Sequence, residues 1–515
     1  MVRVKFSLSE RASGILLHPT SLPGGHGCGD LGPEAFRFAD FLAASGQRWW
    51  QMLPIVPPGS GNSPYHAFSA FAGSPLLISL EVLMEEGLLS ATDLFPDKRF
   101  RENRVDYAAA KAHKGPLLRK AFLRFKERRG LENNTGYKKF CEGMAFWLED
   151  YALFSALKES HQNVSWTEWE TDLRARKPDI LAEAKKKLKE EIEYHRFVQY
   201  QFSRQWSRLR KYCEEYHLGL IGDIPIYVAH DSSDVWAHQE LFYLDRQGNP
   251  TVVAGVPPDY FSRTGQRWGN PLYRWDRMRK EGYVWWIERL RLTFERFNAA
   301  RLDHFIGFQR YWEIPGGAPT AKDGRWVEGP GKDFFDKVLN KLGPLELVAE
   351  DLGLVTDEVK ALRNRFRFPG LHVLQFAFGG DTKNEHLPEN YTAPCIVYTG
   401  THDNDTTVGW FRDAGSKAST RSKQTVLGEK ERALRYLGSD GREIHWDMIR
   451  LALRSTADLA IIPLQDILGL GTEARMNLPG TVEGNWEWRF RRTELTETLS
   501  KQLRSVTEAA GRIRA

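Results

Sequence analysis

The sequence is poor in cysteine. Its 515 residues include four, at Cys28, Cys141, Cys213 and Cys395, with no C-x-x-C pair and no two close together. This spacing excludes a disulfide framework and argues against a metal cage built from thiolates. We therefore expect free thiols, which are typical of a reducing compartment and predict a cytoplasmic protein.

Long apolar runs and a charge excess of one sign are also absent. No stretch reaches the roughly 18 consecutive apolar residues of a membrane-spanning helix, and residues 1–14 hold no apolar segment of signal-peptide length. Lys and Arg total 72 against 67 Asp and Glu, so the formal net charge is +5. A charge this close to balance predicts neither a nucleic-acid-binding surface nor a membrane-surface protein.

Apolar and aromatic residues are plentiful instead. Hydrophobic residues make up 41 % of the chain and charged residues 27 %, a globular composition, and 12 % of all residues are aromatic. Most of these rings are expected in the core. Some could form platforms, because the C–H faces of sugars stack on aromatic rings while sugar hydroxyls need polar partners.

Eight short apolar runs end in polar or charged residues. Their length suits buried parallel strands, and helical patterns separate most of them, which predicts an α/β fold, a (β/α)8 TIM barrel. The expected strands are 14–18, 48–54, 218–226, 297–303, 345–350, 371–376, 395–401 and 459–465. The expected helices are 32–44, 284–296, 332–342, 356–365 and 428–437.

Two connections are too long for simple crossovers. We expect residues 1–515 to form a single catalytic barrel with a mainly helical insertion at 55–216, after the second strand. A second insertion at 228–296, after the third strand, contains the Gly- and aromatic-rich loop 255–271. The charged run 182–195 is interpreted as a solvated helix face. Little chain follows the eighth strand, so we expect no separate C-terminal β-domain.

Carboxylates recur where the expected strands end. They are Asp223 on the third strand, Asp303 on the fourth, Glu350 on the fifth and Asp403 just after the seventh. Barrel enzymes place catalytic groups at these strand ends. Gathered carboxylates repel one another unless a compensating charge or a chemical role holds them. Arg301, two residues before Asp303 and on the same face of the strand, supplies such a charge.

Paired carboxylates beside aromatic platforms predict glycosidic-bond chemistry. One carboxylate attacks the anomeric carbon while a carboxylic acid protonates the leaving oxygen, and a separation of about 5–5.5 Å gives retention of configuration. The alternative for any single strand-end Asp is a loop cap or a salt bridge. That alternative explains four converging carboxylates poorly.

Two other patterns have weaker interpretations. Thr401–Asp405 (THDND) with Glu350–Asp351 could bind a metal, but a metal hydrolase usually needs His clustered at short spacing, and no H-x-H or H-x₃-H run occurs. Gly24–Gly29 (GGHGCG) is glycine-rich like a phosphate cradle but lacks the G-x-x-x-x-G-K-[ST] ending. We interpret it as a flexible loop and expect no cofactor and no metal.

Long motifs along nearly the whole chain resemble one enzyme family. They are ILLHPTSLPG at 15–24, NSPYHAFSAFAGSPLLISL at 62–80, GDIPIYVAHDSSDVW at 222–236, GVPPDYFSRTGQRWGNPLY at 255–273, ARLDHFIGF at 300–308, VAEDLG at 348–353, TGTHDNDT at 399–406 and ARMNLPGT at 474–481. With these motifs the chain resembles the amylomaltases, or 4-α-glucanotransferases (disproportionating enzymes), of the α-amylase clan. The resemblance implies transfer of α-1,4-glucan segments between maltodextrins by a retaining double displacement through a covalent glycosyl-enzyme.

The resemblance also implies roles for individual residues. Asp303 matches the nucleophile, Glu350 the general acid/base, and Asp403 a third carboxylate that holds substrate hydroxyls and favours ring distortion. Residues expected to orient the sugar or the carboxylates are Asp223, Arg301, His304, Asp351 and His402. Residues expected to line the glucan groove are Ser63, Tyr65, Tyr260, Trp268, Phe376 and Asn477. Tyr260 and Trp268 are further expected to close over the bound chain and exclude water.

One departure separates the chain from ordinary α-amylases. Those enzymes have D-x-x-x-N-H after the third-strand Asp, whereas Tyr227 and Val228 stand at the corresponding offsets from Asp223. We expect no required metal there and favour a transferase. An α-1,4-glucan hydrolase and a catalytically silent glucan-binding protein stay as alternatives. The expected partners are maltooligosaccharides, glucose and amylose, with no nucleic acid and no membrane.

Overall fold

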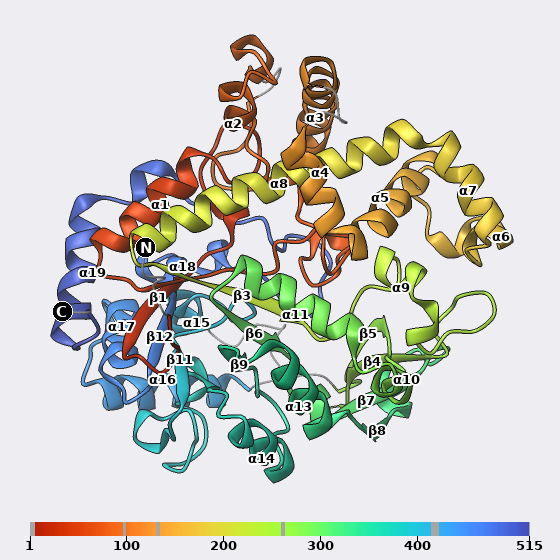
Figure 1. The fold of residues 1–515 in the computed structure, drawn as a ribbon. Helices are drawn as coiled ribbons and strands as arrows, with labels where there is room; N and C mark the ends of the chain where they lie inside the picture. The colour runs from red at the N-terminus through yellow and green to blue at the C-terminus, as the bar shows by residue number, and fades with distance from the viewer. Residues whose placement is uncertain (1–5, 96–98, 130–133, 259–262, 414–421, 514–515) are drawn as a thin grey trace.

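Eight parallel strands form the barrel that the sequence predicts (Figure 1). The computed structural model describes residues 6–95, 99–129, 134–258, 263–413 and 422–513. The strands are β1 Ala12–Leu16, β2 Trp49–Gln51, β3 Gly219–Pro225, β6 Ala299–Asp303, β9 Leu347–Ala349, β10 Gly370–Val373, β11 Cys395–Tyr398 and β12 Leu459–Pro463. They pair in the order β10-β11-β12-β1-β2-β3-β6-β9. Between β9 and β10 the Ala349 N–H donates to the Pro369 carbonyl at 3.0 Å, which links the two ends of the sheet.

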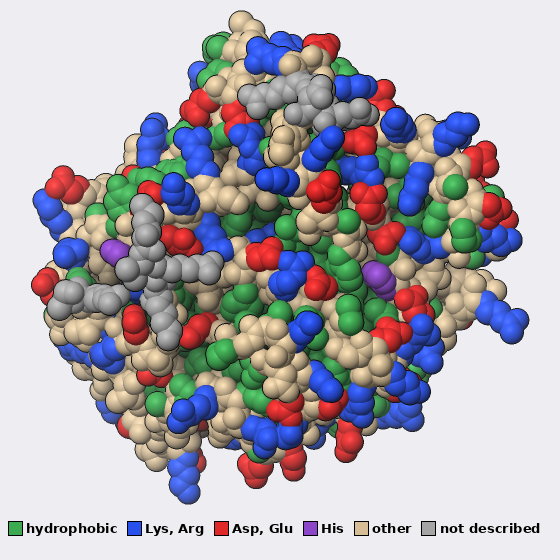
Figure 2. Space-filling model, viewed as in Figure 1, with side chains coloured by type: hydrophobic (Ala, Val, Ile, Leu, Met, Phe, Trp, Pro, Cys, Tyr) green, Lys and Arg blue, Asp and Glu red, His purple; other side chains and the backbone are tan. Residues whose placement is uncertain are grey.

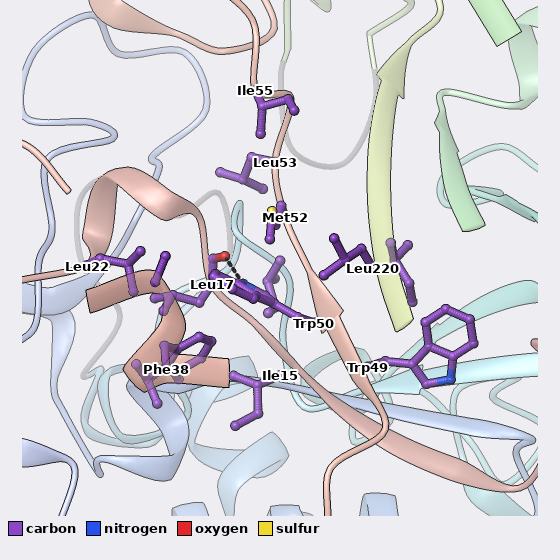
Figure 3. Packing of buried hydrophobic residues seen from close by; sticks show 14 of the residues in the cluster. Ile15, Leu17, Leu22, Phe38, Trp49, Trp50, Met52, Leu53, Ile55 and Leu220 are labelled. Atoms are coloured by element: carbon purple, nitrogen blue, oxygen red, sulfur yellow. Dashed lines mark hydrogen bonds between the residues drawn. The ribbon is translucent and has the colours of Figure 1, made fainter. Parts of the chain in front are cut away.

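Alternating side chains on the short strand β2 show how the barrel is packed. Trp49 and Trp50 are both buried and point to opposite sides of the strand (Figure 3). Trp50 packs edge-on against Phe38 of α1 (Pro33–Ala44), with ring centroids 4.8 Å apart, and its indole N–H donates to the Leu17 carbonyl at 2.8 Å. A β-carbon at Gly14 of β1 would lie 2.5 Å from the Trp49 carbonyl oxygen, so the close approach of these strands requires glycine.

The predicted helices are present around the barrel. They are α1, α11 Val284–Arg296, α13 Gly331–Leu342, α14 Asp357–Arg365 and α16 Lys423–Leu437. Helix α16 begins five residues earlier than predicted, because Ser422 caps it by accepting a hydrogen bond from the Thr425 N–H. Gly428, where the helix was expected to begin, lies within it. The other helices packed around the strands are α8 Lys189–Glu215, α17 Ile444–Arg454 and α19 Glu497–Ala509.

The described part of residues 80–215 is mainly helical, with loops between its helices. Their helices are α2 Leu80–Glu85, α3 Tyr107–Arg129, α4 Thr135–Gly143, α5 Ala145–Ser160, α6 Thr171–Arg174, α7 Pro178–Lys187 and α8. Figure 1 places α2 and α3 at the top of the view and α5–α7 at its right, away from the barrel strands. Residues 182–190 of the charged run are mostly exposed, as predicted, whereas Ile192 and Tyr194 are buried, and Leu188 divides the run between α7 and α8. The boundaries 55–216 and 228–296 of the two insertions stay predictions.

A second, antiparallel sheet was not predicted. It has the order β5-β4-β7-β8 and lies at the lower right of Figure 1. Its strands are β4 Val252–Val256, β5 Gln266–Pro271, β7 Arg310–Pro315 and β8 Arg325–Glu328. Two come from the connection after β3 and two from the connection after β6, so no single stretch of sequence predicts the sheet. Its position matters because β5 carries Trp268.

The remaining described α-helices are short. They are α9 Ser233–Ala237, α10 Trp275–Lys280, α12 Ile306–Gln309, α15 Thr407–Arg412 and α18 Leu464–Ile467. Beyond β12 the described residues form helices and 3₁₀ turns and add no strand to either sheet. All four cysteines are unpaired, as predicted. Among the described helices none has the length and apolar content needed to cross a bilayer. Acidic and basic side chains are intermixed over the face seen in Figure 2.

Candidate active site

Arg301 on β6 joins two of the predicted carboxylates. Its Nη1 lies 2.8 and 2.7 Å from the two carboxylate oxygens of Asp223, and its Nη2 lies 2.8 Å from Oδ1 of Asp303. Asp223 and Arg301 are register partners on β3 and β6, so the two strands position the contact. The side chains of Arg301 and Asp223 are 7 % and 0 % exposed. The guanidinium therefore supplies the charge compensation that the sequence predicted.

Glu350 follows β9 and lies beside this group. Its Oε2 accepts a hydrogen bond from the His304 N–H at 2.7 Å, and its Oε1 accepts one from the Leu352 N–H at 3.3 Å. Burial raises the pKa of Glu350 to about 8, with Arg301 opposing the rise and the charge of Asp303 adding to it. A carboxyl group with this pKa is protonated at neutral pH, as a general acid must be.

His304 adopts a backbone conformation that side-chain-bearing residues seldom use. Its φ is 53°, in the left-handed region, at a typical cost of about 1–3 kcal/mol. This conformation accompanies the hydrogen bond from its N–H to Glu350 and an edge-on contact of its ring with Trp268, with ring centroids 4.9 Å apart. Burial lowers the pKa of His304 to about 4, so the ring is neutral at pH 7.

Tyr65 links this group to the loop after β11. Its hydroxyl donates to Asp223 Oδ2 at 2.7 Å, and its ring stacks on His402 at 5.1 Å and 16°. His402 Nε2 lies 3.4 Å from Oδ1 of Asp403, whose side chain is 48 % exposed. Asn477 Nδ2 donates to the same Asp403 oxygen at 2.6 Å. The third carboxylate therefore stands at the open side of the group.

Other predicted site residues lie less directly at this mouth. The Asp351 carboxylate accepts from the Leu371 N–H at 2.8 Å and pairs with Arg363, and its side chain is 5 % exposed. It joins β9 to β10 and α14 and is not brought into the mouth. Ser63 Oγ accepts from the Tyr65 N–H at 3.2 Å. Phe376, after β10, lies with its ring centroid 5.5 Å from that of His386.

Tyr260 lies outside the described residues. Trp486, which was not predicted, lies with its ring centroid 5.7 Å from that of Tyr65 and 5.9 Å from that of His402. The only hint of it in the sequence is an aromatic residue in the glycine-containing segment Glu483–Trp488. Tyr65 and Asp223 line a small pocket together with Arg289 and Leu292 of α11.

Residues of the two weaker sequence patterns make contacts within the chain. In the described residues, no three or more His, Cys, Asp and Glu side chains are grouped as metal ligands would be. Asp405 of the THDND string instead accepts hydrogen bonds from Thr472 Oγ1 and the Thr406 N–H, both at 2.8 Å. In the GGHGCG segment, His26 lies 3.1 Å from His113 Nε2 and 3.2 Å from Glu81. That segment is anchored to its neighbours, which corrects its interpretation as a flexible loop.

Known proteins are similar to this sequence over almost its whole length. The sequence profile of the 4-alpha-glucanotransferase family matches residues 17–496. A 4-alpha-glucanotransferase of Thermus thermophilus is 50 % identical over 511 residues, which cover 98 % of this chain and 99 % of that protein. One from Synechocystis sp. is 49 % identical over 509 residues, which also cover 98 % and 99 %.

Solved structures share the fold. An amylomaltase from Streptococcus agalactiae, in complex with acarbose, superposes with a TM-score of 0.92 at 38 % identity, covering 98 % of this chain and all of that one. The amylomaltase from Corynebacterium glutamicum has a TM-score of 0.78 at 19 % identity, covering 98 % of this chain and 76 % of its own, and so shares the architecture. On the profile match and the near-complete coverage at 50 % identity, the chain belongs to the 4-alpha-glucanotransferase family.

Proposed function

We propose that this chain transfers α-1,4-glucan segments between maltooligosaccharides, with glucose and amylose among its acceptors and donors, by a retaining double displacement. One observation carries the mechanism. Asp303 is held at 2.8 Å by Arg301, beside a buried Glu350 whose pKa is about 8. A nucleophile beside a protonated acid is the arrangement that retaining glycosidic-bond enzymes require.

In the first step Asp303 attacks the anomeric carbon of the donor. Glu350 gives its proton to the glycosidic oxygen, and the shortened glucan leaves while a covalent bond forms between the sugar and an Asp303 oxygen. Arg301 orients the nucleophile through its second nitrogen, while its first binds Asp223. The strained His304 backbone fixes the acid by donating to Glu350.

In the second step Glu350 acts as a base. The covalent bond removes the negative charge of Asp303, which had raised the pKa of Glu350. That pKa therefore falls in the glycosyl-enzyme, and Glu350 accepts the proton of the incoming 4-hydroxyl more readily. Attack of this hydroxyl on the anomeric carbon frees Asp303 and forms a new α-1,4 bond.

The surrounding side chains suit a sugar. The half-exposed Asp403 can accept hydrogen bonds from substrate hydroxyls, and Asn477 and His402 hold it. The rings of Tyr65 and Trp486 offer apolar faces next to these polar groups. Trp268, beside His304, supports preference for a sugar acceptor over water, because a stacked acceptor covers the glycosyl-enzyme. The four free cysteines support a cytoplasmic location.

Incubation with maltotriose tests the proposal. We expect glucose and maltopentaose and longer chains, with no growth in total reducing ends, when products are separated by chromatography. Glucose and maltose with rising reducing ends would instead make the chain a hydrolase, and binding without any product would make it a glucan-binding protein. Asp303→Asn should lose several decades of rate and all covalent trapping. Near-normal turnover by that variant would refute the assigned nucleophile.

A further inference from the structure

Arg475 connects two loops at the mouth of the barrel. Its Nη2 donates to the Asp403 carbonyl at 2.6 Å, and its Nε donates to the Asn477 carbonyl at 2.7 Å. Asp403 lies in the loop after β11, whereas Asn477 lies in the long segment after β12. One guanidinium group thus holds the main chains of both loops.

The same two loops are tied by Asn477 itself. Its Nδ2 donates to Asp403 Oδ1 at 2.6 Å, and its N–H donates to the His402 carbonyl at 3.1 Å. Both of these bonds require that the two main chains keep their separation. Arg475 fixes that separation because it binds the carbonyl groups of both Asp403 and Asn477. The orientation of the Asp403 carboxylate therefore depends on Arg475.

A simple positive charge would not do the same work. Asp405, whose charge also acts on Arg475, already accepts hydrogen bonds from Thr472 Oγ1 and the Thr406 N–H. The Arg475 guanidinium instead uses two separate N–H groups in a fixed plane to reach two carbonyl oxygens. Lysine has one compact ammonium group on a flexible stem and cannot reproduce this planar fork.

We propose that Arg475 is a positioning residue that sets the Asp403 carboxylate against the substrate. The inference rests on the proposed role of Asp403 in the glucanotransferase reaction. Arg475 touches no reacting atom and acts through the carbonyl groups of Asp403 and Asn477. In this role Asp403 binds the distorted sugar of the transition state more tightly than the bound substrate. Loss of Arg475 therefore lowers kcat more than it changes KM.

The experiment compares Arg475→Ala and Arg475→Lys with the wild type in maltotriose disproportionation. We expect kcat of Arg475→Ala to fall about 100-fold, the usual cost of a misplaced group near the chemistry, and kcat of Arg475→Lys to fall less. Guanidinium ion, at concentrations far below those that unfold the protein, should restore part of kcat to Arg475→Ala. An equal concentration of sodium chloride should not.

Arg512→Ala is the matched control. Arg512 also binds main-chain carbonyl groups, among them those of Ala12 and Leu453, but at the opposite end of the barrel. Assayed below its unfolding temperature, this variant should keep the wild-type kcat and gain nothing from guanidinium. A response of Arg512→Ala equal to that of Arg475→Ala would overturn the inference, because both effects would then be structural.

The outcomes separate this inference from the proposed function. Unchanged kcat in Arg475→Ala, or a loss that guanidinium does not restore, overturns the positioning role. Asp403→Asn decides which idea has failed. If that variant is inactive while Arg475→Ala is normal, only the positioning role falls. If Asp403→Asn keeps the wild-type kcat, both the proposed role of Asp403 and the positioning role of Arg475 are refuted.

Discussion

Among single residues, Glu350 sets the alkaline limit of the reaction. Its pKa is about 8, so its protonated form is lost as the pH rises through that value, and kcat/KM for maltotriose should fall about tenfold for each further pH unit. His304, with a pKa of about 4, does not titrate in this range. The measurement is a pH profile of kcat/KM for maltotriose and for α-glucosyl fluoride. Fluoride leaves without a proton, so an identical alkaline limb for both donors would contradict the acid role.

The same carboxyl group links catalysis to stability. Its folded-state pKa of about 8 lies above the ordinary 4.5, so the native state binds this proton more tightly than the unfolded state does. The contribution to stability is complete below pH 4.5 and is lost as the pH rises to 8. Glu350→Gln should therefore unfold at a higher temperature than the wild type at pH 8 and at the same temperature near pH 4. The exposed Glu443→Gln should shift neither value, and equal shifts at both pH values would contradict the argument.

The sequence predicts some of these residues and misses others for a geometric reason. The carboxylates that end strands were found because strand ends converge by topology. Asp351 was expected with Glu350, but successive residues of extended chain face opposite sides, so Asp351 turns to Arg363 and the Leu371 N–H. Trp486 reaches Tyr65 across more than four hundred residues of chain, and no local pattern encodes such a contact.

At the scale of elements, β5 brings Trp268 against His304. If this ring covers the glycosyl-enzyme, Trp268→Ala should raise the share of hydrolysis over transfer, because water gains access when the stacked acceptor is lost. Trp268→Phe keeps an apolar ring and should change the share less. The test follows reducing ends against transfer products from maltotriose. An unchanged ratio in Trp268→Ala would end the shielding argument.

Helix α3 depends on one buried ion pair. Lys114 is 1 % exposed and donates to Asp30 at 2.8 Å and to the carbonyl groups of Leu76 and Ile78 at 2.8 and 3.0 Å. Lys114→Ala leaves a buried carboxylate and two carbonyl groups without their donor, which should lower the free energy of unfolding by about 3–5 kcal/mol. Denaturant unfolding measures it. The exposed Lys111→Ala on the same helix should cost far less, and equal costs would contradict this account.

The elements also show where prediction from sequence ends. Each barrel strand is a continuous apolar run because both of its faces are buried, and that signal is local. The sheet β5-β4-β7-β8 has no such signal, because its strands come from two connections and are recognisable only after pairing. Helix α16 begins before the predicted 428–437 because Ser422 provides its cap.

On the scale of the whole molecule, the barrel is closed unevenly. β1 and β12, which come from the two ends of the chain, pair over five residues, whereas Ala349 and Pro369 link β9 to β10. The number of strand–helix units can be predicted from the sequence. The number of residues over which neighbouring strands pair depends on their register and cannot be predicted in this way. The seam between the chain ends therefore holds the barrel together from both termini.

Arg512 reinforces this seam from its outer end. Its guanidinium donates to the carbonyl groups of Ala12, at the start of β1, and Asp458, just before β12, and also to those of Leu453, Ser455 and Ala457. Arg11 also donates to the carbonyl groups of Leu453, Ser455 and Ala457, and the Ala12 N–H donates to that of Asp458. The cost of removing Arg512 is therefore mainly that of its own buried, charged hydrogen bonds, and Arg512→Ala should lower the free energy of unfolding by roughly 3 kcal/mol or more.

Arg504→Ala is the matched control for Arg512→Ala. Arg504 lies on α19 and donates to the single carbonyl group of Ala44 at 3.4 Å, so its loss should cost well under 1 kcal/mol. Unfolding of both variants can be followed by tryptophan fluorescence. If Arg512→Ala is no less stable than Arg504→Ala, the hydrogen bonds of Arg512 do not stabilise the pairing of β1 with β12. If Arg512→Ala is less stable but keeps its kcat below the unfolding temperature, Arg512 stabilises the barrel without affecting the active site. We expect this result because Arg512 binds residues where the strands start, whereas the reaction takes place where the strands end.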